Sequence, residues 1–454
     1  MTKAKSGDPS ELLALADGLI SSAEGSEQIE VIISRGESTT VKVHSGEVEA
    51  LTSAGSAAAG IRVVRDGRPG FATCGTLDPD VLAESLAQAR ENCEFAEADE
   101  FAGIAEPDGV EAISQDLWAD EVLATSTEAK IAMAIELESM VVGADPRVKS
   151  ARTTTYGDGW GHAAIASTSG IRRVAEESSC SVGTQPLAVD DGETQIGWGS
   201  DASRDPEKLD LHKVADEAVD RATKLLGAMK PKSAKLPIVL EPRLAITLLG
   251  IVSSMLSAEA VQKGRSPFAD RLGEKIGSPL LTLWDDPTRS ESLAADEWDR
   301  EGLACRPNQL LDNGRLCQHL FDSTTARRGG TVSTGSAVGS VRGLPGPGPQ
   351  LLVMEPGETP SEELLAGVKL GLAVESFAGL HSGVNPVSGD FSVGADGLMI
   401  RDGAFAEPVR ELTVASTIQR LLSEVSQVGD DFEWLPSGSG ACSVRIDDVS
   451  ISGS

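Results

Sequence analysis

Residues 381–417 read HSGVNPVSGDFSVGADGLMIRDGAFAEPVRELTVAST, and their pattern indicates the architecture of the second half of the chain. Apolar and polar residues alternate on both sides of Asp402-Gly403, which is typical of two half-buried strands. An Asp-Gly pair tolerates the positive φ angles of a tight hairpin turn. The glycines that precede this hairpin permit further tight turns, where Asp390 is suited to accept backbone hydrogen bonds. The stretch therefore predicts an antiparallel hairpin.

The same hairpin signal recurs toward the N-terminus. In LLDNGRLCQHLFD (310–322) the pair Asn313-Gly314 lies between alternating segments, and Ser45-Gly46 and Asp66-Gly67 do the same in the first half. Short strands rich in Ser, Thr and Gly are predicted between Val148 and about Gly199. Both halves are therefore expected to be α+β, with antiparallel sheet dominant in the second.

Helical periodicity separates these strands. It predicts helices at residues 9–22, 77–96, 125–140, 205–228 and 244–263. A further helix is predicted in TPSEELLAGVKLGLAVES (359–376), where Thr359, Pro360 and Glu362 form the pattern of a capping box.

A linker composition marks the expected domain boundary. The stretch MKPKSAKLP (229–237) is rich in Lys, Pro and Ser, and no repeat of fixed period is found on either side of it. The sequence predicts two domains, residues 1–235 and residues 236–454.

The composition indicates which kinds of partner the chain is suited to bind and in which cellular compartment it is expected. Seventy acidic residues against 39 basic residues give a net charge of −31, which disfavours binding to a phosphate backbone. No apolar run is long enough to span a bilayer, and the N-terminus lacks the features of a signal peptide. The six cysteines form no C-x-x-C pair, so we expect a reducing cytoplasm rather than a disulfide scaffold.

Residues for metal or nucleophilic chemistry are sparse. No two of the five histidines lie within six positions of each other, so no H-x-x-x-H pair exists. All five are interpreted as surface or structural residues. His162 is expected in a Gly-rich turn and His381 in a loop, whereas the patterns place His44 in a strand, His212 in a helix and His319 at the end of a strand. The chain has neither a nucleophile elbow nor a P-loop. Cys442 has no identifiable basic partner and is interpreted as a small buried residue.

Three stretches together resemble the TldD/TldE (PmbA) family along nearly the whole chain. The first is residues 381–417. The second is residues 310–337, in which 322–328 follow the family pattern D-x-x-T-A-R-R and 333–337 follow S-T-G-N-A with Ser336 in place of Asn. The third is RDGRPGFATCGTLDPDVLAESLAQA (65–89), which resembles the family's G-x-x-G-F strand and the helix after it.

The resemblance implies a fold and a division of labour. It implies an N-terminal α+β domain and a C-terminal domain with a curved antiparallel sheet around a central helix. TldD-type subunits of the family are zinc metallopeptidases whose helix carries H-E-x-x-x-H, with a cysteine as a further ligand. TldE-type subunits share the fold, lack those ligands and join the first type to enclose the active chamber.

The stretch AEAVQK (258–263) resembles the counterpart of that zinc helix. Ala258 and Lys263 stand at the positions of the missing histidines, and Glu259 remains. Alanine offers no lone pair, and a protonated lysine repels a divalent cation. Glu259 alone cannot hold a metal or act on metal-activated water, so it is interpreted as vestigial. No catalytic, metal or cofactor residue is therefore assigned to this chain, and zinc is expected in a TldD-type partner.

Three functions stay open at this point. The resemblance favours a non-catalytic TldE-type subunit of a cytoplasmic metallopeptidase complex that acts on unfolded or short peptides. A stand-alone homodimer that binds a peptide or a small molecule is the second. The third is a diverged hydrolase that tailors a peptide-like metabolite and uses Cys442, His381 and Asp390. No nucleic-acid or membrane partner is expected for any of them.

Overall fold

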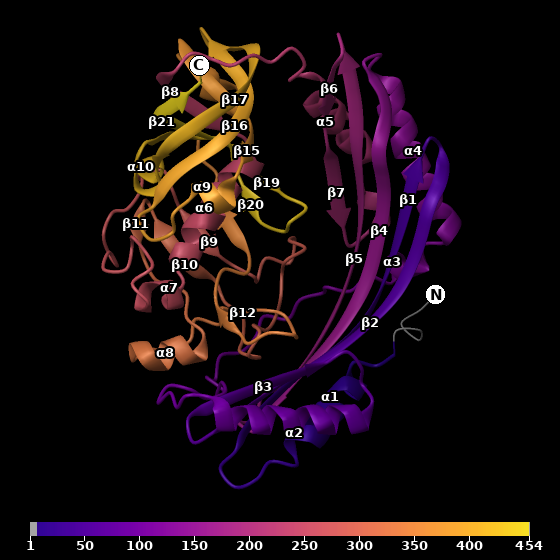
Figure 1. Cartoon of the computed structure of the whole chain (residues 1–454), viewed down its shortest axis with the longest axis vertical. Helices are drawn as coiled ribbons and strands as arrows, with labels where there is room; N and C mark the ends of the chain where they lie inside the picture. Colours follow the sequence, from indigo (N-terminus) through magenta and orange to yellow (C-terminus); the bar gives the residue numbers. More distant parts are fainter. Residues whose placement is uncertain (1–6, 454) are drawn as a thin grey trace.

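The structure is a computed structural model that describes residues 7–453. A long, curved antiparallel sheet forms one side of the molecule, and the second half of the chain forms the other side (Figure 1). The strand order of the long sheet is β3-β2-β1-β4-β5-β6, with β7 also paired to β5. Its strands are β1 (Gln28–His44), β2 (Glu47–Arg65), β3 (Arg68–Cys74), β4 (Val148–Ser167), β5 (Arg172–Asp190), β6 (Glu193–Ile196) and β7 (Gly199–Ser203).

Helices cover one face of this sheet, at two places along its length. They are α1 (Ser10–Ile20), α2 (Pro79–Phe95), α3 (Asp120–Ala124), α4 (Thr127–Ala144) and α5 (Leu211–Thr223). Ile29 and Ile33 of β1 pack with α1 and α2, whereas Val41 and Val43 pack with α4 and α5. All four positions are odd-numbered and so share one face of β1. The opposite face of β1 is turned toward the second half of the chain, where Ile32 packs with Leu303.

The second half is built around a buried helix, α6 (Pro242–Met255), as the family resemblance implied. Its main sheet runs β17-β16-β15-β8-β21-β18, and an additional β17–β21 pairing closes five of these strands into a barrel. The strands are β8 (Ala234–Leu240), β15 (Leu370–Ala378), β16 (Asp390–Arg401), β17 (Ala404–Thr417), β18 (Val425–Val428) and β21 (Val444–Ser452). One large apolar core joins α6 to this sheet.

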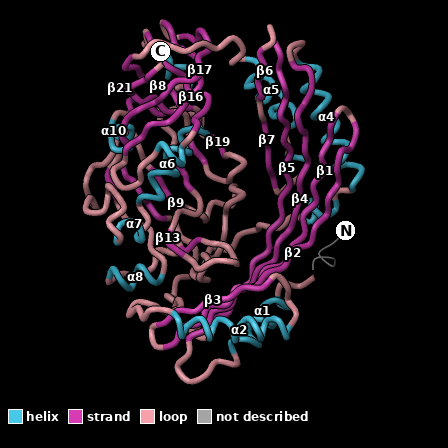
Figure 2. The backbone as a smooth tube through the Cα atoms, in the orientation of Figure 1, coloured by secondary structure: helices cyan, strands magenta, loops and turns pink. Residues whose placement is uncertain are grey.

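A smaller sheet completes the second half on another side of α6. Its strand order is β11-β10-β9-β14-β20-β19, and a separate pair joins β12 to β13 (Figure 2). The short strands are β9 (Leu283–Asp285), β10 (Asn308–Asp312), β11 (Arg315–Leu316), β12 (Ala337–Val338), β13 (Gly346–Pro347), β14 (Leu352–Met354), β19 (Glu433–Trp434) and β20 (Gly440–Ala441). The remaining helices are α7 (Ala258–Gln262), α8 (Ser323–Gly329), α9 (Leu380–Gly383) and α10 (Ile418–Ser423).

The predicted hairpins are confirmed. Both residues of Ser45-Gly46, Asp66-Gly67, Asn313-Gly314 and Asp402-Gly403 have positive φ. The α+β class is confirmed as well. The domain boundary between residues 235 and 236 stays a prediction, although every strand of the long sheet ends before it and β8 begins at Ala234.

Three predicted elements are wrong in detail. The strands expected to be short between 148 and 199 include β4 and β5, of 20 and 19 residues. Pairing with β1 specifies the register of β4, which a Ser-, Thr- and Gly-rich sequence leaves unspecified. The helix expected over 244–263 ends at Met255 and restarts at Ala258. The break follows from the bonds of Leu256 and Ala258 to the backbone of Leu320.

The helix predicted over 359–376 is also absent. Only residues Ser361–Leu365 form a 3-10 turn, and residues from Leu370 onward form strand β15. Gly367 adopts φ +74°, which ends the turn, and Leu372 and Val374 are buried between β8 and β16. Burial in the barrel therefore overrides the capping pattern.

Buried charges join the long sheet to the second half. The Arg62 guanidinium of β2 contacts Glu30 of β1 at 2.7 Å and Glu301 at 3.0 Å, and all three side chains are at most 7% exposed. The second Glu301 carboxylate oxygen accepts the amide of Ser323 at the start of α8. Burial lowers the pKa of Arg62, but the two carboxylates outweigh it and raise the pKa above its ordinary value.

A second junction uses a residue of the family signature. The Arg327 guanidinium of α8 donates to the carbonyl oxygens of Phe101, Gly103 and Ile104 at 2.7–3.2 Å. Its neighbour Arg328 makes one half-exposed ion pair with Asp99.

We therefore expect Arg327→Ala to lower the free energy of unfolding by about 2–4 kcal/mol, because three carbonyl groups lose a charged donor. The matched variant Arg328→Ala loses one partly exposed ion pair and a contact with the Phe101 ring, and should cost less, about 1 kcal/mol. Urea unfolding followed by circular dichroism measures both. Equal losses would show that Arg327 does not hold the junction.

Candidate functional site

Helix α7 occupies the position that the resemblance gave to the zinc helix. The Ser257 hydroxyl accepts the amide of Ala260 and so caps it, and the amide of Ala258 donates to the carbonyl of Leu320. The Ala258 side chain is fully buried. A bulkier side chain at this position would have to displace the neighbouring atoms.

The polar side chains of α7 contact one another and α8. Lys263 forms an i,i+4 ion pair with Glu259, and both side chains are about half exposed. The Gln262 amide donates to the carbonyl of Thr325 at 2.7 Å, which holds α7 against α8. Glu259 is thus a surface carboxylate paired with a cation.

These residues do not fit a zinc ion. Ala258 has no donor atom, and the protonated ammonium of Lys263 has no lone pair for a metal. Cys442 is fully buried in the main apolar core, and burial, with a smaller contribution from Asp431, raises its pKa to about 12. Between residues 7 and 453, no group of three or more His, Cys, Asp or Glu side chains is arranged to hold a metal.

The residues of the hydrolase hypothesis are not joined to one another. His381 lies in α9 rather than in a loop, and Asp390 begins β16, where its carboxylate accepts the Ser388 hydroxyl at 2.7 Å. In the described part of the chain, no hydrogen bond or ion pair links His381, Asp390 and Cys442. The turn before β16 is instead stabilised by Asn385, whose side chain accepts the amides of Val387 and Ser388.

The other four histidines lie at unrelated places in the fold. His162 lies in strand β4, not in the turn predicted for it, and is buried against the rings of Trp118 and Trp160 at centroid distances of 5.2 and 5.0 Å. Burial lowers the pKa of His319. His44 ends β1 and His212 lies in α5, as the sequence predicted.

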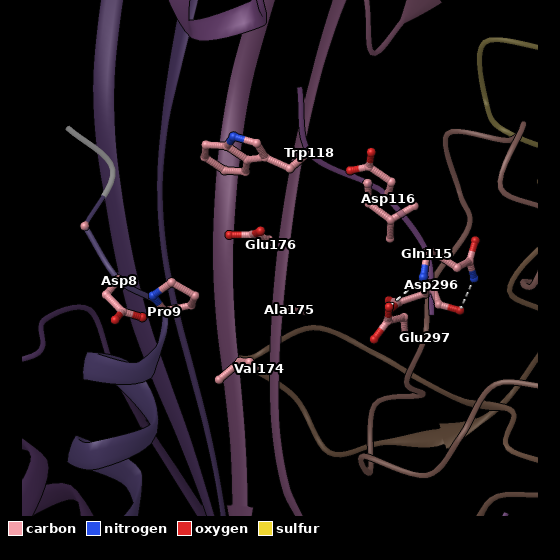
Figure 3. Close-up of a pocket in the computed structure, with 12 residues that line it drawn as sticks. Asp8, Pro9, Gln115, Asp116, Trp118, Val174, Ala175, Glu176, Asp296 and Glu297 are labelled. Carbon is pink, nitrogen blue, oxygen red and sulfur yellow. Dashed lines mark hydrogen bonds between the residues drawn. The ribbon is translucent and has the colours of Figure 1, made fainter. Parts of the chain in front are cut away.

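A cavity of about 750 Å³ lies between the long sheet and the second half. Its walls come from the start of α1, the segment 115–118, residues 174–176 of β5 and the loop at 296–297 (Figure 3). The lining includes five carboxylates and no lysine or arginine: Asp8, Asp116, Glu176, Asp296 and Glu297. Trp118 supplies an aromatic wall. We call this space the acidic cavity.

Gln115 holds the loop that carries Asp296 and Glu297. The backbone amide of Gln115 donates to the Glu297 carboxylate at 2.7 Å, and its side-chain amide donates to the carbonyl of Asp296 (Figure 3). The same side-chain amide also donates to the carbonyl of Pro287. Burial, helped by the charges of Glu177 and Glu297, raises the pKa of Asp296 to about 6. The cavity is therefore a carboxylate-rich space whose charge depends on pH.

Sequence reasoning missed this cavity. Its walls come from segments far apart along the chain and carry no shared motif, so only the tertiary fold brings them together. The acidic composition of the whole chain was the one available signal, but a composition does not predict which carboxylates lie close together in the fold.

Comparison with known proteins identifies the family. Three family models match in order: PmbA/TldA metallopeptidase domain 1 at residues 29–93, the central domain at 120–226 and the C-terminal domain at 233–453. The fold and these matches define a protein of the metallopeptidase-related PmbA/TldD class. The chain belongs to the PmbA/TldD family.

Relatives and solved structures agree along the whole length. The metalloprotease PmbA of Escherichia coli O157:H7 is 25% identical over 90% of this chain and 88% of its own. The PmbA homolog of Haemophilus influenzae is 24% identical over 100% and 98%. A Thermotoga maritima crystal structure, described as a candidate modulator of a DNA gyrase, shares 26% identity with a TM-score of 0.84 and covers 98% of this chain and 99% of its own. TldE from Thermococcus kodakarensis shares the fold, with a TM-score of 0.86, 22% identity and coverage of 98% and 99%.

No helix within residues 7–453 is both long enough and apolar enough to cross a membrane.

The protein purified without chelator should contain far less than one zinc per chain by elemental analysis, because Ala258 and Lys263 offer no ligand. One zinc per wild-type chain would contradict this expectation.

Introducing both histidines, as Ala258→His with Lys263→His, should lower the free energy of unfolding by about 1–3 kcal/mol, because the first substitution overfills a buried position. Lys263→His alone, at an exposed position, is the control, and its free energy of unfolding should stay within about 0.5 kcal/mol of wild type.

The pKa of Asp296 predicts a pH effect on stability. Between the ordinary value of 3.8 and about 6, the folded state keeps a proton that the unfolded state has lost. The contribution of this group to the free energy of unfolding is therefore present below about pH 4 and is lost as the pH rises through about 6. Asp296→Asn should gain stability relative to wild type across this window, as measured by urea titrations at several pH values. Asp116→Asn, at an exposed wall of the same cavity, is the control, and an equal gain there would reject the explanation.

Proposed function

We propose that this chain is a non-catalytic TldE-type subunit of a metallopeptidase complex. It joins a TldD-type chain, which holds the zinc, and together they cleave or mature short or unfolded peptides in the cytoplasm. The observation that supports this is helix α7, where the residues that the resemblance aligns with the two zinc histidines are a fully buried alanine and a lysine paired to Glu259. A methyl group and a protonated ammonium do not bind zinc.

The family supports the catalytic half of this proposal. Its matching relatives are named metalloproteases, and one solved relative of the same fold is named TldE. A chain that matches their length, and whose described residues 7–453 include no group of three or more side chains able to hold a metal, is suited to complete a chamber rather than to cut. Glu259 then has no role in the reaction.

A second function has one observation in its favour. The acidic cavity, at about 750 Å³, is within the size range of small-molecule sites. It would suit a stand-alone, homodimeric protein that binds a peptide or a small molecule with a positive charge. The hydrolase alternative gains no such support, because Cys442 is buried as a thiol.

Reconstitution tests the main proposal. The chain is mixed with a TldD-type chain from the same genome, and cleavage of an internally quenched, unstructured peptide is followed. We expect activity from the mixture and none from this chain alone. Full activity of the TldD-type chain by itself, or activity of this chain alone, would overturn the proposal.

The variant Glu259→Gln sharpens this test. It should leave the activity of the mixture unchanged within about twofold, because a carboxylate paired with Lys263 on the surface contributes little to any transition state. A loss of about 100-fold or more would instead show that Glu259 acts as a general base. Circular dichroism of the variant controls for folding.

A further inference from the structure

Arg300 is a buried arginine whose hydrogen-bonding capacity is almost unused. Its side chain is 6% exposed, and a guanidinium has five N–H donors. Nε donates one long hydrogen bond, at 3.4 Å, to the carbonyl of Ser340, whereas Nη1 donates none and lies 3.6 Å from a carboxylate oxygen of Glu30. The other oxygen of that carboxylate accepts a bond from Arg62 at 2.7 Å. Because buried donors are normally bonded, the unused donors of Arg300 indicate a binding site.

A cavity of about 340 Å³ lies beside this guanidinium, between the long sheet and the second half. Its lining includes residues 163–165 of β4, 173–175 of β5, and residues 298–300 and 337–339 of the second half. We call this space the arginine cavity. It adjoins the acidic cavity, since Val174, Ala175 and Asp296 line both (Figure 3). Its volume is within the range of small-molecule sites, which are often found at domain junctions.

Arg173 of β5 brings a second guanidinium to this lining. Its Cζ atom lies 3.9 Å from the centroid of the Trp298 ring, a stacking contact that orients the side chain. Nη1 donates to the carbonyl of Arg172 at 3.0 Å, but the buried Nε has no hydrogen-bond partner. Arg173 forms no ion pair with any residue that the structure describes. The two guanidiniums are therefore only partly neutralised by the protein.

Two aspartates also line the arginine cavity, but they bond to the backbone instead. The Asp299 carboxyl accepts three backbone amides at 2.9–3.1 Å, and Asp296 accepts one at 3.2 Å. Burial, with the charge of Glu301, raises the pKa of Asp299, and burial also raises the pKa of Asp296 to about 6. Within residues 7–453, neither aspartate forms an ion pair with Arg173 or Arg300. The cavity therefore favours an anionic ligand.

We propose that the arginine cavity binds a small organic carboxylate, whose oxygens accept hydrogen bonds from Arg300 and Arg173. Guanidinium groups match carboxylates because their N–H donors are arranged in pairs. The apolar body of the ligand packs on Ile32, Ile165 and Val338, which line the same space. Branched aliphatic walls favour a compact, branched hydrocarbon body. This inference goes beyond the proposed function and does not depend on it, since it concerns another cavity and a ligand of opposite charge.

Calorimetric titration of the full chain with 4-methylpentanoate tests the proposal. We expect a Kd below about 1 mM. The amide 4-methylpentanamide has the same shape without the charge, and it should bind about tenfold more weakly or worse. Inorganic phosphate should also bind more weakly than the carboxylate, because it leaves the apolar walls uncovered.

A second probe, N-acetylleucine, distinguishes two sources of the carboxylate. It carries the same branched body next to an amide and a free carboxylate, as the C-terminus of a peptide does. Tighter binding than 4-methylpentanoate would assign the site to peptide C-termini, and weaker binding would assign it to free carboxylic acids. Both outcomes keep the carboxylate on the two arginines.

Variants locate the bound anion. Arg173→Met removes one guanidinium but keeps a long side chain, and it should weaken binding of 4-methylpentanoate about tenfold or more. Arg172→Met is the matched control, because Arg172 is exposed and pairs with Asp17 outside the cavity. Its affinity should stay within about twofold of wild type. Ala163→Leu fills the cavity without changing a charge and should abolish binding, with circular dichroism as the control for folding.

Three results overturn the inference. The first is no saturable binding of 4-methylpentanoate up to about 10 mM. The second is equal affinity for the acid and its amide. The third is binding that survives both Arg173→Met and Ala163→Leu, which would place the ligand elsewhere. None of these results changes the outcome of the reconstitution experiment, so this site and the proposed function fail separately.

Discussion

The buried contact of Arg62 with Glu30 and Glu301 is the constraint on which the arrangement of the two halves depends. It places one cation of the long sheet between carboxylates from both halves, at most 7% exposed. Removing one partner of a buried charge group leaves the others unpaired in a medium that solvates them poorly. Because Glu301 also binds the start of α8, the same contact orients the family signature that begins there. The acidic cavity lies between the surfaces that this contact holds together.

Helix α7 and the acidic cavity are two places where the sequence and the structure bear on the chemistry of this chain. At α7, Ala258 has no donor atom and Glu259 is paired with its neighbour Lys263. In the cavity, five carboxylates lie on the lining, and burial raises the pKa of Asp296. Function follows from the site rather than from the fold.

The helix predicted over 359–376 is absent because burial in the barrel outweighs the local capping signal. Thr359, Pro360 and Glu362 form a capping pattern, but it yields one 3-10 turn. Leu372 and Val374 gain more from burial between two strands of the barrel than they would on an exposed helix. The break of α6 before α7 has a similar origin, since the Leu320 amide donates to the carbonyl of Leu256 and the Leu320 carbonyl accepts the amide of Ala258.

By itself, the sequence determined the α+β class, the hairpins at Asp402-Gly403 and three similar pairs, and the family. These depend on local φ preferences, on hydrophobic periodicity and on short motifs, all of which are properties of neighbouring residues. Only the tertiary structure decided the length of β4 and β5, the burial of Ala258, the acidic cavity and the arginine cavity. Each of these depends on contacts between segments far apart in the chain, and local sequence does not encode which surfaces meet or which stay open.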